Sequence, residues 1–187
     1  MPLQATAEGT PAAMPLPRWQ RLDRRLFAWM GAGHRAHPLM LVVAKTVAHW
    51  SWVPLLSLML TVVQRDGRGL LALAQCLLVA TLVQVVSKRL SRHIAYARPF
   101  TQGLSPNHLN HSPRAGFPST HATVMGAVFG FMLLHMVPGP ALAGMAVVML
   151  ATGWARVYAG AHFPLDVLAG LLVGGTSGAA LAAAFMA

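Results

Sequence analysis

Long apolar runs separated by short polar stretches dominate the chain from residue 39 onward. The runs cover residues 39–63, 70–90, 122–137, 141–157 and 165–185. An α-helix needs about 20 consecutive apolar residues to cross the hydrocarbon core of a bilayer, and a helix also satisfies its own backbone hydrogen bonds there. The pattern therefore predicts an all-α, polytopic membrane helix bundle with about five transmembrane helices.

The amino-terminal segment divides into two parts of different character. Residues 1–17 are rich in Ala, Pro and Thr and lack the basic start, apolar core and cleavage site of a secretory signal, so we expect a disordered tail. Between residues 19 and 31, apolar side chains alternate with arginines, which is the pattern of an amphipathic helix in the lipid headgroup layer. Residues 18–187 are expected to form a single membrane-embedded domain.

Composition supports a membrane protein and narrows the possible partners. The chain is 56% hydrophobic and 10% charged, whereas soluble domains carry about 25% charged residues. Its net charge is +10, but membrane proteins keep basic residues at the ends of their spans, so nucleic acid is not indicated as a partner. Anionic lipid headgroups or a phosphorylated substrate fit this charge better. Cys76 is the only cysteine, which excludes an intramolecular disulfide.

The first apolar run contains two polar side chains on one helical face. Lys45 and His49 are four residues apart, with Trp50 and Trp52 nearby. The favoured interpretation is an interfacial zone with a snorkelling lysine and an aromatic belt. The alternative is a helix face that lines a substrate site.

Two polar segments are predicted to meet at one end of the bundle. Residues 91–120 form a long polar loop, and such loops in compact proteins are usually functional. Residues 156–166 form a second polar segment. Because two spans lie between them, both segments are expected on the same side of the membrane.

The second polar segment has the composition of a nucleophilic site. Ionisable groups among membrane segments are costly and indicate function by default. Pro164 suits the first position of a helix, which makes Phe163 the cap and places Asp166 in the first turn. His162 then lies beside that carboxylate, which can hold one ring nitrogen while the other attacks. The alternative is a membrane-interface cluster without chemistry.

Several residues at the same end suit a phosphate group. Ser119 lies where a helix N-cap is expected, so the N–H groups of the turn that begins at Thr120 are expected to face an anion. His121 can supply the proton that a leaving oxygen needs. Lysine and arginine side chains match phosphate oxygens, arginine through its forked donors; the basic residues at this end are Lys88, Arg89, Arg92, Arg98 and Arg156. Together these residues indicate phosphoryl transfer without a metal or other cofactor.

A zinc site is the competing interpretation. Four histidines could in principle surround a zinc ion; they are His108, His111, His121 and His162. Neighbouring arginines would repel a cation, however, and no cysteine or second carboxylate is nearby. His108 and His111 are more simply interpreted as solvated loop histidines.

Three motifs together resemble the signature of the type 2 phosphatidic acid phosphatase superfamily. They are Arg98-Pro99; Pro118-Ser119-Thr120-His121; and Arg156, His162 and Asp166, separated by five and three residues. With their flanking residues the motifs resemble, more narrowly, the undecaprenyl-diphosphate phosphatases of the bacitracin-resistance type. The similarity covers roughly residues 20–180.

This resemblance implies a membrane phosphatase that acts on a lipid substrate, most narrowly undecaprenyl diphosphate, at the outer face of a bacterial cytoplasmic membrane. It implies that His162 attacks phosphorus to form a phosphohistidine and that Asp166 orients it. His121 would protonate the leaving group and later activate water, while Arg98, Arg156 and the Ser119 region hold the phosphate oxygens.

Other functions remain open at this point. Within the superfamily, they are phosphate transfer to an acceptor such as lipid A, and hydrolysis of phosphatidylglycerophosphate or phosphatidate. Outside it, the chain would be a non-catalytic lipid-binding protein or a small transporter.

Two features depart from simple expectation. The superfamily pattern places a lysine seven positions before Arg98, where this chain has Ser91. Lys88 lies one helical turn earlier and its stem can extend toward the aqueous end, so we predict that it compensates; Arg92, about 100° away around the helix, is the alternative. The second feature is the orientation of the protein in the membrane. The amino-terminal arginines are expected on the same side as the site, and basic residues favour the cytoplasmic side, whereas the resemblance implies a site at the outer face.

Overall fold

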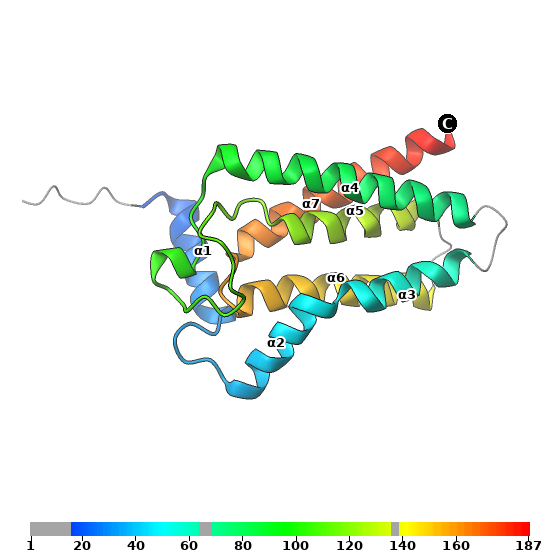
Figure 1. The fold of residues 1–187 in the computed structure, drawn as a ribbon. Coiled ribbons are helices and arrows are strands. Elements are labelled where there is room, and N and C mark those ends of the chain that lie inside the picture. The colour runs from blue at the N-terminus through cyan, green and yellow to red at the C-terminus, as the bar shows by residue number, and fades with distance from the viewer. Residues whose placement is uncertain (1–15, 64–68, 136–138) are drawn as a thin grey trace, which may run out of the picture.

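Every element of regular secondary structure in the described part of the chain is a helix. The computed structural model describes residues 16–63, 69–135 and 139–187, so most of the predicted tail lies outside the described residues. Its helices are α1 (Arg18–Met30), α2 (Pro38–Trp50), α3 (Trp52–Val63), α4 (Gly69–Ile94), the short 3-10 helix η1 (Phe100–Gln102), α5 (Thr120–His135), α6 (Pro140–Tyr158) and α7 (Pro164–Met186). Helices α3 to α7 run along one axis, and α1 lies across one end (Figure 1). The predicted all-α fold is confirmed.

The structure has up to four candidate membrane spans in its described part, against about five predicted. Three helices, α4, α6 and α7, are each long and apolar enough to cross a membrane, and α2 with α3 forms a fourth, bent candidate. Helix α5 is apolar but has 16 residues, which is shorter than the length usual for a span. Each of the five predicted apolar runs therefore corresponds to a helix or a helix pair.

The first span is not one continuous helix, and the prediction for residues 39–63 was wrong in this respect. The helix is interrupted at Ser51, and the axis of α3 is bent by 49° from that of α2. Pro54 lies in the first turn of α3; it has no N–H to donate, and its ring clashes with the carbonyl of Trp50, four residues earlier. The break leaves carbonyls in the last turn of α2 available to partners outside that helix.

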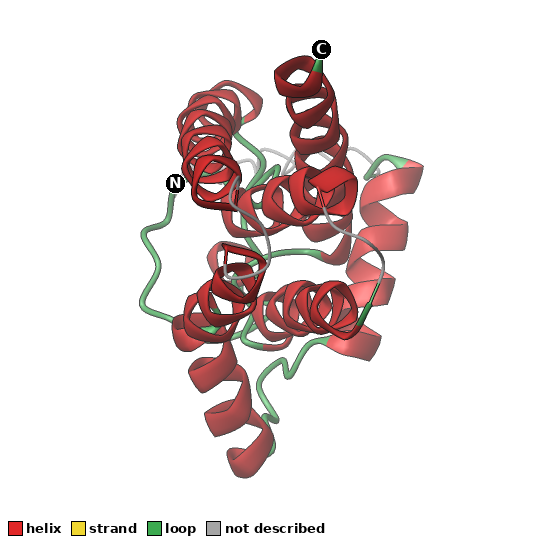
Figure 2. Ribbon diagram, turned by 90° about the vertical axis from the view of Figure 1, so that its right-hand side faces the viewer, coloured by secondary structure: helices red, strands yellow, loops and turns green. Residues whose placement is uncertain are grey.

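The bundle is centred on the contact between α5 and α7. A Cβ atom added to Gly174 would overlap the carbonyl oxygen of Thr123, and one added to Gly178 would overlap that of Ala127. Small residues of this kind allow membrane helices to bring their backbones close together. Helix α4 packs against α5, while α6 packs against α2, α3 and α5; Figure 2 shows the bundle along its long axis.

Helix α1 covers the end of the bundle where the polar segments meet. Asp23 and Phe27 are buried on its inner face, and the Phe27 ring packs edge-on against Phe163, with centroids 5.5 Å apart. Trp29, on the outer face, is 84% exposed. The predicted amphipathic helix is thus observed, and it contacts α6 and α7 directly (Figure 1).

Candidate active site

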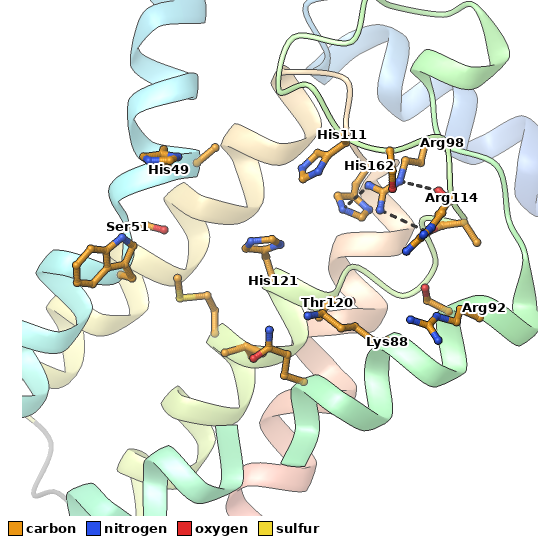
Figure 3. A pocket seen from close by; sticks show the side chains of 18 residues that line it. His49, Ser51, Lys88, Arg92, Arg98, His111, Arg114, Thr120, His121 and His162 are labelled. Carbon is orange, nitrogen blue, oxygen red and sulfur yellow. Dashed lines mark hydrogen bonds between the residues drawn. The ribbon is translucent and has the colours of Figure 1, made fainter. Parts of the chain in front are cut away.

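A cavity of about 660 Å³ opens at the end of the bundle that α1 covers. Its walls come from the α2–α3 bend, the last turns of α4, the loop before α5, the first turns of α5, and the loop between α6 and α7. Figure 3 shows histidine side chains on one side of this cavity and basic side chains on another. The two polar segments predicted to share one side of the membrane do meet here.

His162 lies at the wall of the cavity and is almost completely buried. Arg98 Nη1 lies 3.0 Å from His162 Nε2. A guanidinium group can only donate hydrogen bonds, so we assign the lone pair to Nε2 and the proton to Nδ1. Nδ1 is 3.6 Å from Oδ2 of Asp166, slightly beyond hydrogen-bond length. The carboxylate therefore faces the protonated nitrogen, as the sequence predicted.

The surroundings of His162 keep its ring neutral. Burial is the main cause, and the positive charges of Arg98 and Arg156 add to it, so the pKa of His162 is well below its ordinary value. A neutral imidazole has a free lone pair at physiological pH. Nε2 is thus a competent nucleophile once Arg98 gives up its hydrogen bond.

The start of α7 agrees with the sequence prediction and adds one residue to it. Phe163 is the N-cap, Pro164 follows it, and Asp166 lies in the first turn. Asp166 Oδ2 accepts a hydrogen bond from the Phe163 N–H at 2.9 Å. The Leu165 N–H donates to Oδ1 of Asp23, also at 2.9 Å. Since phenylalanine has no capping oxygen, Asp23 of α1 supplies the cap from a distant part of the chain.

Arg98 is fixed in place by the loops around it. Its Nε donates to the carbonyl of Arg114 and its Nη1 to the carbonyl of Ala161, each at 2.9 Å. Burial lowers the pKa of Arg98, although a guanidinium remains charged at any physiological pH. The Arg98 guanidinium group is thus held between His162 and the cavity.

Arg156 is expected to hold phosphate oxygens, but it is not among the residues that line the cavity. It is buried, with Nη2 donating to the carbonyl of Ala48 at 2.9 Å and Nη1 to His111 Nε2 at 2.7 Å. Ala48 lies in the last turn of α2, where the break at Ser51 makes its carbonyl available. Of Arg156 and His111, it is His111 that lines the cavity.

The amino-terminal end of α5 forms another wall. Thr120 and His121 both line the cavity, and α5 begins at Thr120, which puts Ser119 at the N-cap position. The Ser119 hydroxyl is buried and has no hydrogen-bond partner among the described residues. This helix end also brings its positive dipole to the cavity wall.

Both candidates for the missing superfamily lysine face the same cavity. Lys88 and Arg92, four residues apart on α4, line it together with Ser91 between them (Figure 3). Arg114, from the long loop, is also part of this basic wall. The geometry therefore brings Lys88 and Arg92 to the site without distinguishing their roles.

His111 and His49 are the site residues that sequence reasoning placed wrongly. The His111 ring lies 6.3 Å from that of His121 and 6.5 Å from that of His162, so its interpretation as a solvated loop histidine is corrected. His49 and Trp52 line the cavity, which favours the substrate-lining interpretation of the first span, whereas Lys45 is not among the lining residues. Neither histidine belongs to a recognisable motif, and the sequence offers no signal for the role of Asp23, which lies among the arginines of the amphipathic segment.

The zinc interpretation finds no support in the geometry. Within residues 16–63, 69–135 and 139–187, no group of three or more His, Cys, Asp or Glu side chains is placed to hold a metal ion. Two of the histidines at the cavity instead contact arginines, His162 contacting Arg98 and His111 contacting Arg156.

Known proteins resemble this chain over most of its length. The protein YbjG of Escherichia coli (strain K12), named as a putative undecaprenyl-diphosphatase, is 32% identical over 159 residues, which are 83% of this chain and 78% of YbjG. An undecaprenyl-diphosphatase of Sulfolobus acidocaldarius is 28% identical over 142 residues, 73% of this chain and 64% of that protein.

A solved structure shares the fold. The transmembrane PAP2 type phosphatidylglycerolphosphate phosphatase of Bacillus subtilis superimposes with a TM-score of 0.69 at 21% identity, over 93% of this chain and 89% of that one. The family model described as the PAP2 superfamily matches residues 69–187. On this match and the similarity to YbjG, the chain belongs to the PAP2 superfamily.

Proposed function

We propose that this protein is a lipid-diphosphate phosphatase that hydrolyses undecaprenyl diphosphate to undecaprenyl phosphate and inorganic phosphate. The observation that carries the proposal is the arrangement of His162, whose unprotonated Nε2 is held by Arg98 at the wall of a cavity rich in cationic side chains. The names of the two relatives above support the choice of substrate. Residues 18–187 act as one catalytic domain in this proposal.

The first step forms a phosphohistidine. The terminal phosphate enters the cavity and takes over the Arg98 hydrogen bond, which releases the Nε2 lone pair of His162. Nε2 attacks the terminal phosphorus, the new N–P bond forms, and the P–O bond to the lipid phosphate breaks. His121, which takes up a proton when the anionic diphosphate binds beside it, gives this proton to the leaving oxygen. Asp166 stabilises the positive charge that develops on the His162 ring, because it faces Nδ1 at 3.6 Å.

The second step restores the protein. His121, now unprotonated, takes a proton from a water molecule that attacks the phosphorus on the side opposite Nε2. The N–P bond breaks, inorganic phosphate leaves, and His162 recovers its neutral form. One water molecule is consumed per diphosphate, so atoms and charge balance without a further reactant.

The phosphate oxygens have several donors available. Arg98 supplies a forked guanidinium, and the first turn of α5, from Thr120 onward, supplies backbone N–H groups. The Ser119 hydroxyl, which has no hydrogen-bond partner among the described residues, is a further donor. Lys88 and Arg92 approach from α4. These fixed positive groups stabilise the charge that spreads over the equatorial oxygens during phosphoryl transfer.

The cavity also suits the lipid part of the substrate. Trp52, Val124 and Met125 line it beside the polar residues, so the first isoprenyl carbons can contact apolar side chains while the diphosphate meets the cations.

The site is proposed to face the outside of a bacterial cytoplasmic membrane. A single cysteine introduced at Asn107, in a Cys76→Ala background, should then react with an impermeant maleimide in intact cells; labelling only after lysis would place the site in the cytoplasm.

The decisive experiment compares the purified full-length protein with its His162→Ala variant. Phosphate release from undecaprenyl diphosphate in detergent or vesicles is expected for the wild type and lost in the variant. Labelling with a substrate carrying ³²P in its terminal phosphate should give an acid-labile, alkali-stable phosphoprotein in the wild type only. Equal activity in both preparations would overturn the mechanism. No activity on this lipid, phosphatidate, phosphatidylglycerophosphate or lipid A would favour a non-catalytic lipid-binding protein.

A further inference from the structure

His111 is one of the histidine side chains that line the cavity. Its ring is next to those of His121 and His162, at centroid distances of 6.3 and 6.5 Å. It lines the same cavity as both of them (Figure 3). None of the three motifs includes it, and the mechanism above assigns it no step.

The backbone of His111 is fastened in place. Its N–H donates to Oδ1 of Asn107 at 3.0 Å, and its carbonyl accepts a hydrogen bond from Nδ2 of Asn107 at 2.8 Å. A side chain that pairs with both backbone groups of one residue holds that residue in a defined position. The loop therefore presents His111 to the cavity in a fixed geometry.

The side chain of His111 has a defined protonation state. Arg156 Nη1 lies 2.7 Å from His111 Nε2, and since arginine only donates, Nε2 accepts and Nδ1 carries the proton. Burial, with the charges of Arg156 and Arg98, lowers the pKa of His111 to about 4. The ring is neutral at physiological pH, and a neutral ring is the form that can accept from Arg156.

Arg156 has both terminal nitrogens engaged within the protein. Nη2 donates to the carbonyl of Ala48 and Nη1 to His111. These two acceptors, one on α2 and one in the long loop, determine where the guanidinium lies. Both acceptor residues line the cavity, Ala48 from α2 and His111 from the long loop.

We propose that His111 is a positioning residue that fixes the guanidinium group of Arg156 behind the cavity wall that the site histidines form. This inference rests on the proposed function, because it assigns a role within the same site. Without the ring, Arg156 keeps one of its two acceptors, and its positive charge is no longer fixed next to His121 and His162. The effect of His111 on turnover should then pass through Arg156.

A double-mutant cycle tests this proposal with undecaprenyl diphosphate and, separately, with the soluble ester p-nitrophenyl phosphate. His111→Ala is expected to lower kcat/KM about tenfold to 100-fold, the usual effect of removing a hydrogen bond to a charged group. His111→Gln keeps an acceptor near the Nε2 position and should recover most of this loss. In the Arg156→Ala background, His111→Ala should cost little more, because coupled residues are not additive.

Control variants separate this role from a general effect on the loop. His93→Ala removes an exposed histidine at the end of α4 that pairs with its own helix, at the carbonyl of Arg89, and should retain wild-type kinetics. Asn107→Ala, which releases the loop clamp, should change kcat/KM in the same direction as His111→Ala but less. Thermal unfolding of each variant in detergent identifies those that fail to fold.

Several outcomes would overturn the proposal. Additive losses in the double variant, or no recovery with His111→Gln, would show that His111 does not act through Arg156. A faster His111→Ala variant would mean that the ring competes with the substrate for Arg156. If undecaprenyl diphosphate is not hydrolysed by the wild type, the proposed substrate is wrong. The same cycle is then read from p-nitrophenyl phosphate, or from the affinity for inorganic phosphate.

Discussion

Residues 69–187 and residues 16–63 contribute to this active site in different ways. The first region contains the three motifs and the whole PAP2 match. The second contains no motif residue, yet it accepts two hydrogen bonds at the centre of the site, at Asp23 from the Leu165 N–H and at the Ala48 carbonyl from Arg156. In the proposed mechanism, the groups that meet phosphate come from α4, α5 and the loops of the first region. Asp23 of α1 and the Ala48 carbonyl of α2 accept hydrogen bonds from Leu165 and Arg156 of that region.

This difference explains why one region is recognisable in sequence and the other is not. Chemistry demands particular side chains, so His121, His162 and Asp166 form a pattern. Ala48 contributes a backbone carbonyl at the end of α2 to the contact with Arg156, and every residue type has such a group. A positioning contact of this kind has a geometric requirement and leaves little trace in residue identity.

The largest effect is expected from breaking the close contact inside the motif-bearing region. In Gly174→Ala, the new Cβ atom would overlap the Thr123 carbonyl, where backbone meets backbone and neither side can move away cheaply. Such overpacking costs about 1–3 kcal/mol or more, and separating α5 from α7 also moves His121 away from His162. We expect near-complete loss of phosphate release and a lower unfolding temperature.

The adjacent residue provides the control for this prediction. A Cβ atom at Gly175 would meet the carbonyl oxygen of Gly126 at 3.8 Å, an ordinary contact. Gly175→Ala should therefore keep both activity and stability. Equal behaviour of the two variants would show that the separation of α5 and α7 does not control the site.

A smaller effect is expected from the basic residues of α4. Lys88→Ala should raise KM about tenfold, since it removes one charge-assisted contact with phosphate, and Arg92→Ala should raise it less. In the Lys88→Ala background, Ser91→Lys should restore binding, because Ser91 lines the same cavity at the position of the superfamily lysine. Steady-state kinetics on the lipid diphosphate measure this. An unchanged Lys88→Ala beside an impaired Arg92→Ala would reverse the assignment.

Local sequence chemistry predicted the parts of the site that depend on neighbours in the chain. Pro164 marks where α7 begins, which correctly places Asp166 in its first turn and His162 just before it. The parity of the apolar runs then brought Arg98 to the same end. These predictions succeed because helix starts and span counts depend on short segments of sequence.

The remaining features depend on contacts between distant segments. His111 reaches the cavity because Asn107 binds its backbone and Arg156 donates a hydrogen bond to its ring. Neither contact follows from the spacing of residues in the sequence. Asp23 is paired with an N–H group 142 residues away. Pro54 could have signalled the break within residues 39–63, but the sequence interpretation rested on the length of the apolar run.

A modest effect is expected from breaking the contact between α1 and α7. Asp23→Ala removes the acceptor for the Leu165 N–H, and loss of a helix cap usually costs about 1 kcal/mol. Because Asp166 is in the same helical turn, kcat should also fall by a few-fold, with little change in KM. Asp23→Asn keeps the Oδ1 acceptor and is the matched control. A wild-type rate and unfolding temperature in Asp23→Ala would show that α1 does not help position α7.

The smallest effect, and the most specific, is the pH dependence of this same contact. Burial raises the pKa of Asp23 from 3.8 to about 6, and the Leu165 hydrogen bond offsets only part of that shift. The folded protein therefore holds this proton more tightly than the unfolded chain, so the stability that Asp23 contributes is full below pH 3.8 and is lost as the pH rises through about 6. Asparagine does not titrate. The unfolding temperature of the wild type minus that of Asp23→Asn should decrease between about pH 4 and pH 7 and then level off. If this difference in unfolding temperature instead increases over the same pH interval, the folded protein favours the carboxylate form of Asp23 over the carboxylic acid.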